Sequence, residues 1–166
     1  MKYSLVGVDE NAFAVLGYTA NALKTEGLSN LKEEMYQKAI DFMDYRYGIN
    51  KSGGVAVLRI ETGEYLISVW DEEINESAYL CAEVGAICEA HKLNKKVTHS
   101  LCVCRLNDGE DSKILSPCGI CQERLFYWGN DVKCAITNDS NDIIFKSLKE
   151  RQIPTFLNCL LSGTSI

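Results

Sequence analysis

No stretch of this sequence is hydrophobic over a length that could cross a membrane. The hydrophobic fraction of 46% is ordinary for a globular protein, but no run approaches the roughly 18 apolar residues of a membrane span. Residues 1–13 hold only a short apolar stretch before Asp9 and Glu10, too short for the core of a secretory signal. We therefore expect a protein without a membrane partner, located in the cytoplasm.

An excess of positive charge is also missing. Lys and Arg number 17 against 23 Asp and Glu, so the formal net charge is −6 at pH 7. Affinity for a phosphate backbone comes from clustered Lys and Arg. The basic cluster of Lys92, Lys95 and Lys96 is small, and its position suits the end of a helix, where cations complement the dipole. The charge balance argues against a nucleic acid as partner or substrate.

Cysteine, by contrast, is plentiful, with eight among 166 residues. Without a secretory signal, reduced thiols are the simplest account of so many. Three of them lie in the short segments Cys81-Ala82-Glu83 and Pro117-Cys118-Gly119-Ile120-Cys121. Read together, these segments give C-A-E … P-C-x-x-C, the three-cysteine form of a zinc deaminase signature.

The signature assigns a role to each residue. The thiolates of Cys81, Cys118 and Cys121 would fill three positions of a zinc tetrahedron and leave the fourth open for water, which separates a catalytic zinc from a structural one. Glu83 is then the general acid/base and not a ligand. Residues 81–92 and 119–128 read as helices, the second ended by Gly129. Their N-termini would point at the metal and favour thiolate over thiol.

Two other readings of the cysteines stay open at this point. A lone C-x-x-C is also typical of a structural zinc half-site or a redox pair. A fourth ligand could come only from Cys102 or Cys104, but these lie in a strand-like run and read more simply as small buried hydrophobes on one face. A redox motif would not need C-A-E. A catalytic zinc is therefore the preferred reading.

On these residues the chain resembles the short cytidine deaminases and their blasticidin S deaminase relatives, over roughly residues 29–150. The segment 122–125 also resembles the one that follows the family's second cysteine pair. The resemblance implies a three-layer α/β/α fold with a mixed five-stranded sheet, one Zn²⁺ per subunit and a homotetramer. It implies hydrolytic deamination at C4 of an aminopyrimidine, in which Glu83 moves protons to N3 and to the leaving amine. It also assigns Ala82 to substrate binding.

The chain departs from the family pattern at two places. Many members carry Arg directly after the catalytic Glu, where this chain has Val84, and we assign the offsetting charge to Arg124 as a hypothesis. The family's ribose-binding stretch corresponds to residues 74–80, whose Tyr79 lies closer to the cysteine than usual. Asn75 is the residue we name there for substrate binding, with a helix N-cap as an equally good reading.

Three segments are expected along the chain. Residues 1–28 form a helical extension that ends at Gly27 and has no counterpart in the family. Residues 29–150 form the deaminase-like domain, and 151–166 are a tail. The domain begins with an amphipathic helix, opened by Ser29, whose apolar stripe is Leu31, Met35, Ala39, Phe42 and Met43. Strands are expected at 54–60, 65–70, 97–106, 132–137 and 142–146.

Three functions follow from this reading. The preferred one is zinc-dependent deamination of a free cytosine nucleoside. The second is the same chemistry on another aminopyrimidine, such as blasticidin S. The third is a catalytically silent deaminase fold that serves as a binding module, against which Glu83 argues because a silent fold does not need it.

Overall fold

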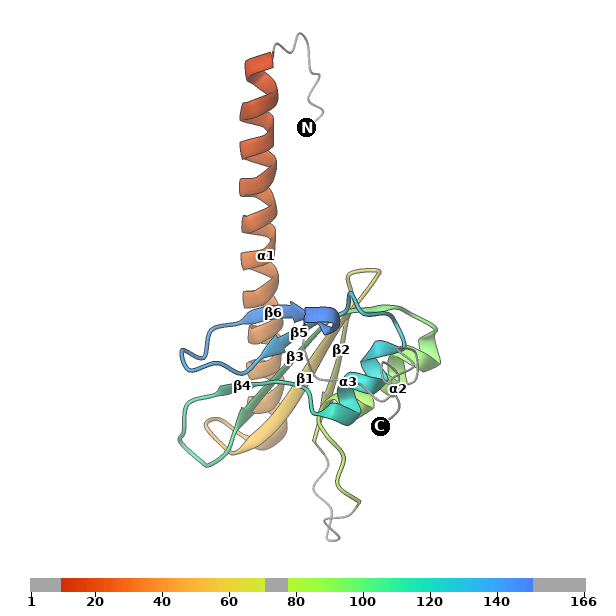
Figure 1. The fold of residues 1–166 in the computed structure, drawn as a ribbon. Coiled ribbons are helices and arrows are strands. Elements are labelled where there is room, and N and C mark those ends of the chain that lie inside the picture. The colour runs from red at the N-terminus through yellow and green to blue at the C-terminus, as the bar shows by residue number, and fades with distance from the viewer. Residues whose placement is uncertain (1–9, 71–77, 151–166) are drawn as a thin grey trace. The chain divides into compact units, whose positions relative to one another are not determined.

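The computed structural model describes residues 10–70 and 78–150, with side chains in the first helix described at Gly27 and from Asn30 onward. The chain divides into two units, Met1–Glu34 and Met35–Ile166. In the first unit, residues 10–34 are helical. The second unit holds the end of this helix and all of the sheet (Figure 1).

Helix α1 spans Glu10–Tyr47 without a break, so the predicted end at Gly27 and the predicted N-cap at Ser29 are wrong. The φ angle of Gly27 is not positive, and a Cβ at this position would meet no atom within 4 Å. A single glycine inside a helix costs only about 1 kcal/mol relative to alanine, which does not end a helix by itself. The predicted boundary between residues 28 and 29 thus falls inside one helix, and that division stays a prediction.

The sheet is mixed and runs in the order β2-β1-β3-β5-β6. Its strands are β1 (Gly53–Ile60), β2 (Tyr65–Val69), β3 (Val97–Arg105), β5 (Lys133–Ile136) and β6 (Ile144–Ser147). Strand β5 is parallel to β3, and the other neighbours are antiparallel. These are the five predicted strands. A short sixth strand, β4 (Lys113–Leu115), also pairs with β3 and lies outside the five predicted strands.

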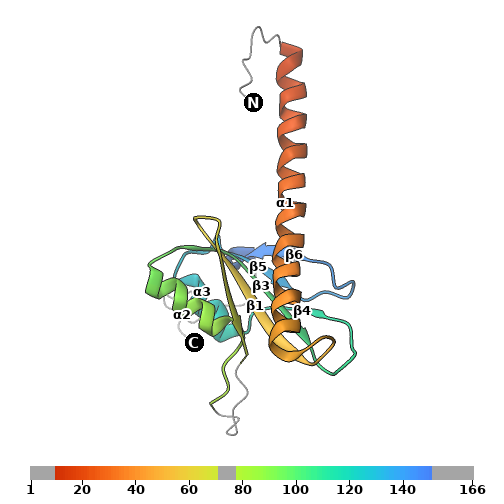
Figure 2. The same ribbon diagram turned by 180° about the vertical axis from the view of Figure 1, so that it is seen from behind.

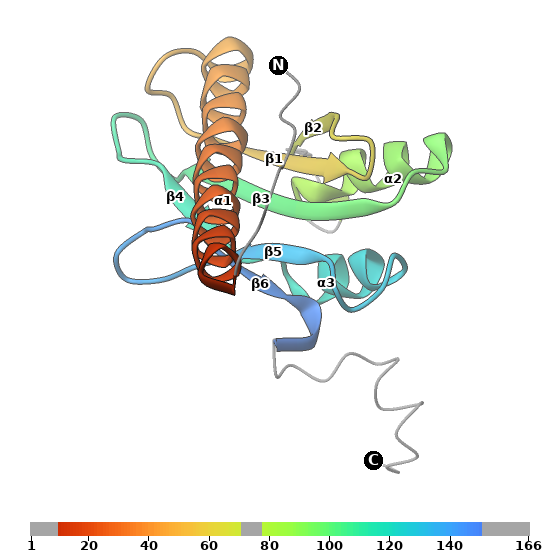
Figure 3. The same cartoon turned by 90° about the horizontal axis from the view of Figure 1, so that it is seen from above.

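Helices cover both faces of the sheet, which confirms the expected α/β/α layers (Figures 1 and 2). On one face, Met35, Ala39 and Met43 of α1 are fully buried, as their predicted stripe requires. On the other face lie α2 (Glu83–Leu93) and α3 (Gly119–Phe126), side by side (Figure 3). No helix in the described part of the chain is long and apolar enough to cross a membrane.

Alternation along β1 and β3 decides which face each side chain meets. Ala56, Leu58 and Cys102 belong to the core cluster beneath α2 and α3. Their neighbours Val55, Val57, Leu101 and Val103 are fully buried on the α1 side. Because β3 is the central strand and covered on both faces, the four consecutive residues 101–104 are all apolar and buried, without alternation.

The connections of the sheet bring the signature residues together. Helix α2 lies between β2 and β3 in the chain, and α3 lies between β4 and β5. Both helices therefore begin on the same face of the sheet, with Cys81 just before α2 and Cys118 just before α3.

Candidate metal centre and active site

The three cysteines of the signature converge. The sulfur atoms of Cys81, Cys118 and Cys121 all lie within 4.8 Å of one another, and the Cys81 and Cys118 sulfurs are 3.4 Å apart. A tetrahedral zinc with bonds of about 2.3 Å needs sulfur separations of about 3.8 Å. Among the His, Cys, Asp and Glu side chains of the described residues, these three cysteines lie close enough together to hold one metal ion. The donor set therefore fits Zn²⁺.

Local structure at α3 fixes two of these sulfurs. Cys118 is the N-cap of the helix, and Cys121 lies buried in its first turn. The side-chain amide of buried Gln122 donates a hydrogen bond to the Pro117 carbonyl at 2.7 Å. This bond holds the turn that enters the helix. The sequence singled out Gln122 only as part of a matching segment, and its positioning role comes from the structure.

The third sulfur comes from the start of α2. Cys81 precedes the helix, and its carbonyl accepts a hydrogen bond from the Val84 N–H at 3.0 Å. Ala82 is the N-cap residue and is buried; its carbonyl accepts a hydrogen bond from the Ser68 hydroxyl on β2. The first turn of α2 is thus tied to the sheet edge, which sets the direction in which Cys81 and Glu83 point.

The thiols strongly perturb one another's ionisation. Burial raises the pKa of Cys121 far above its ordinary value, and the negative charges of Glu83 and Cys118 raise it further. Burial likewise raises the pKa of Cys81. Burial acts in the same direction at Cys118, but hydrogen bonds from the Cys121 backbone N–H and the neighbouring thiols outweigh it, so the Cys118 pKa lies below its ordinary value. A divalent cation would offset both the burial and the neighbouring negative charges that raise the pKa of Cys81 and of Cys121.

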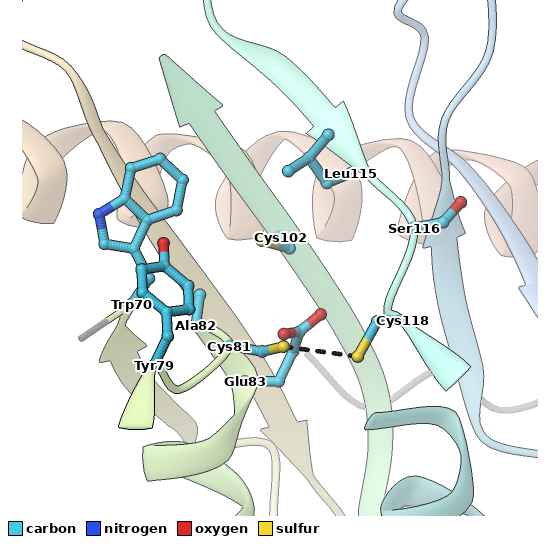
Figure 4. Close-up of a pocket in the computed structure, with 9 residues that line it drawn as sticks. All are labelled: Trp70, Tyr79, Cys81, Ala82, Glu83, Cys102, Leu115, Ser116 and Cys118. Carbon is cyan, nitrogen blue, oxygen red and sulfur yellow. Dashed lines mark hydrogen bonds between the residues drawn. The ribbon is translucent and has the colours of Figure 1, made fainter. Parts of the chain in front are cut away.

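Glu83 sits beside the three sulfurs and is only 4% exposed. Burial raises the pKa of its carboxyl group above the ordinary value, against opposing hydrogen bonds from its own backbone N–H and from Cys121. It is the first residue of α2, two positions after Cys81. Its carboxylate points into the same cavity as the sulfurs of Cys81 and Cys118 (Figure 4).

That cavity has a volume of about 200 Å³. Its floor is formed by Cys81, Ala82, Glu83 and Cys102, with Cys118 at one side. Its upper walls are Trp70, Tyr79, Leu115 and Ser116. The sequence did not single out Trp70, Leu115 or Ser116 as site residues, because they come from separate elements and share no motif.

Other sequence expectations have different outcomes. Cys102 and Cys104 are buried in β3 as expected, and they do not join the three sulfurs. The seven cysteines in the described part of the chain form no disulfide bond with one another. Asn75 lies outside the described residues. Val84 is buried and Arg124 is exposed on α3, and the role of Arg124 as a compensating charge stays a prediction.

Known proteins resemble this chain in structure. The crystal structure of the cytidine deaminase from Bacillus anthracis is 48% identical; the match covers 80% of this chain and 94% of that one, with a TM-score of 0.74. Two others, at 17% and 19% identity, show the fold alone: the cytidine deaminases of Mycobacterium leprae (74% and 97% covered, TM-score 0.57) and Mycobacterium tuberculosis (76% and 95%, 0.53). Comparisons with protein-family models and with curated proteins gave no match.

Proposed function

The chain belongs to the cytidine deaminase family, and on that premise we propose that it hydrolyses the 4-amino group of a free cytosine nucleoside, releasing ammonia and the uracil nucleoside. Zinc-dependent aminohydrolase chemistry agrees with the donor set. The observation that carries the proposal is the convergence of three sulfurs beside a buried carboxylate at the floor of one cavity.

In this proposal Cys81, Cys118 and Cys121 hold the zinc ion, which, when bound, supplies a Lewis acid able to activate water near neutral pH. The N-terminus of α3 contributes to the charge balance, because the Cys121 backbone N–H already stabilises the anionic form of Cys118. With three protein ligands, such a zinc ion would have room for one water, and the cavity beside Cys81 and Cys118 offers space for it.

Glu83 moves the protons. Its carboxylate accepts one proton from the attacking water and gives it to the ring N3. It then accepts the second proton from the hydroxyl group added at C4 and gives it to the departing amine, so that the products are a carbonyl at C4 and ammonia. Its burial fits this role, since a carboxyl with a raised pKa takes up and gives back a proton more readily near neutral pH. Ala82, at the cavity floor, and Asn75 are the substrate-binding residues of the proposal.

The size and chemistry of the cavity support a small free substrate. A volume of about 200 Å³ lies below the roughly 300–1,000 Å³ that is typical of ligand pockets, and the chain carries a net charge of −6. A nucleic-acid polymer would meet an acidic protein without a large basic surface. Pyrimidine salvage in the cytoplasm is the setting that we propose, and it agrees with a metal site built from free thiols.

We also propose a homotetramer. Large apolar side chains are exposed around α2 and α3, including Leu80 (43%), Leu93 (46%), Ile120 (64%) and Tyr127 (71%). Exposed apolar surface of this kind marks sites of association. Light scattering coupled to gel filtration measures the state; a monomer at micromolar concentration would contradict this part of the proposal.

A substrate panel tests the function. Ammonia release from cytidine, deoxycytidine and blasticidin S is compared by kcat/KM, with the Glu83→Gln protein as the blank. We expect turnover of the two nucleosides. Deamination of blasticidin S alone would mean that this compound, and not a nucleoside, is the substrate. The proposed reaction would stand, because the reacting 4-aminopyrimidine is the same. No turnover of any of the three by zinc-loaded protein would favour the silent binding module.

A further inference from the structure

Trp70 reaches the cavity from the edge of the sheet. It follows the last residue of β2, and its backbone N–H donates a hydrogen bond to the Gly54 carbonyl of β1 at 3.2 Å. Its side chain is partly buried, packs against the core cluster beneath α2 and α3, and lines the cavity. The indole therefore lies on the sheet face that carries the sulfurs and Glu83.

The Trp70 indole occupies space that is open only because residue 54 is a glycine. A Cβ at Gly54 would lie 2.3 Å from Cε3 of Trp70 and 2.6 Å from its Cδ2, closer than real Cβ atoms approach other atoms. Gly54 is the second residue of β1 and pairs with Cys104 of β3, and a glycine within a paired strand has no side chain to pack and weakens it. A glycine at this position is thus explained by the close approach of the indole.

The opposite side of the cavity has a different character. In Figure 4, Trp70 and Tyr79 stand on one side, Leu115, Ser116 and Cys118 on the other, and Cys81 and Glu83 lie between them at the floor. Two reciprocal backbone-to-side-chain hydrogen bonds hold the second wall: the Ser116 N–H donates to the Thr137 hydroxyl at 3.0 Å, and the Thr137 N–H donates to the Ser116 hydroxyl at 2.9 Å. A flat group entering between these walls would meet the metal centre with its far edge.

We propose that Trp70 is the ring-binding residue of this site: its indole stacks on the pyrimidine of the substrate, and Gly54 is present to let it do so. The inference rests on the proposed deamination of a cytosine nucleoside. An aromatic side chain that stacks on a base contacts the face of the ring and does not contact the sugar hydroxyls. It fixes the plane of the ring, so that C4 faces the metal centre and N3 faces Glu83.

The kinetic test uses full-length, zinc-loaded protein. Losing one base-stacking aromatic is worth roughly 5- to 150-fold in affinity, so Trp70→Ala should raise KM for cytidine by about that factor, and Trp70→Phe should raise it less. Gly54→Ala should also raise KM, because the new methyl displaces the indole. The double variant Gly54→Ala/Trp70→Ala should be no worse than Trp70→Ala alone, since both changes remove the same contact. Zinc content is measured for every variant.

A binding test does not depend on turnover. The chain has two tryptophans, Trp70 and Trp128, so Trp128→Phe leaves Trp70 as the only one. In Glu83→Gln/Trp128→Phe protein, cytidine should quench the fluorescence of Trp70 with saturation. In the matched Glu83→Gln/Trp70→Phe protein, in which Trp128 remains, cytidine should cause no change.

The outcomes separate the two proposals. A KM within about twofold of wild type in both Trp70 variants, or fluorescence of Trp70 that cytidine leaves unchanged, would overturn the stacking role while leaving the deaminase function intact. If Trp70→Ala fails to fold, the phenylalanine variant and the titration still decide. Lack of ammonia release by the wild type, together with saturable quenching of Trp70, would instead overturn the function and keep the ring-binding site.

Discussion

The two faces of the sheet serve different purposes. The face beneath α2 and α3 carries Cys102, the three sulfurs and Glu83, and it is hollowed by a cavity. The face beneath α1 is filled by Met35, Ala39 and Met43, all fully buried. The comparison shows how one central strand, β3, supports both: alternate residues face a site that needs open space and a core that needs none. Changes on one face should alter activity, and changes on the other should alter stability.

The largest effect should come from a ligand on the cavity face. Cys121→Ser replaces a buried sulfur with a harder, poorer zinc ligand, and we expect loss of zinc and of activity. Metal analysis of the purified protein checks this. Cys88→Ser is the matched control, because Cys88 is exposed on α2 and away from the metal site; it should keep one zinc per chain. Full zinc occupancy in Cys121→Ser would contradict the assignment.

The second largest effect should come from the substitution Glu83→Gln. The amide cannot carry the proton, and general acid–base work is typically worth about 10²- to 10⁴-fold in rate. We expect a fall in kcat of at least this size with zinc and fold retained. Glu89→Gln on the same helix is the control, since Glu89 is exposed and should leave kcat unchanged. A kcat for Glu83→Gln near that of the wild type would require another proton carrier.

On the α1 face, the sharpest contrast is a buried ion pair. Arg105 of β3 is only 5% exposed, and it donates a hydrogen bond to Asp44 of α1 at 2.6 Å. Asp44→Ala would leave the buried guanidinium with only the Lys51 carbonyl, at 3.5 Å, as a hydrogen-bond acceptor. Loss of the half-buried carboxylate should cost about 2–3 kcal/mol in the free energy of unfolding. Urea denaturation measures this cost. The exposed pair of Lys51 and Asp108 is the control, because breaking a surface pair changes stability little. We expect kcat to be unaffected in both.

A smaller effect should appear as a pH dependence of stability. His99 lies on the α1 face, where burial and the charges of Arg59 and Lys133 lower its pKa to about 4. An unfolded histidine titrates near about 6.5, so between these values the unfolded state binds more protons and stability falls as the pH drops. From pH 7 to pH 5 the wild type should lose about 1 kcal/mol more than His99→Asn, after allowance for partial exposure. Equal losses of unfolding free energy in the wild type and in His99→Asn, measured by urea denaturation, would contradict the lowered pKa of His99.

The smallest effect should follow removal of residues 1–28. The remaining part of α1 keeps Met35, Ala39 and Met43, which anchor it to the sheet. We expect zinc content and kcat to be unchanged, although association between subunits is free to change. A truncated protein that stays soluble but binds no zinc would show that the predicted domain boundary is misplaced.

The sequence predicted the cysteines and Glu83 at the floor of the cavity and missed Trp70 and Leu115 in its two walls, for a physical reason. Cys81 with Glu83, and Cys118 with Cys121, are local pairs on helix starts, so short spacing fixes their geometry. Trp70 and Leu115 come from the ends of two strands, and only the register of the sheet brings them together. The predicted break at Gly27 failed because local turn chemistry was given more weight than the continuity of the helix.

The most direct measurement follows zinc and activity in the same preparation. Zinc is removed from the full-length protein with a chelator and restored in steps, and ammonia release from cytidine is measured at each step. We expect a rate of ammonia release proportional to bound zinc, reaching its maximum at about one zinc per chain. Equal activity in zinc-free protein, or no ammonia from protein that holds one zinc per chain, would contradict it.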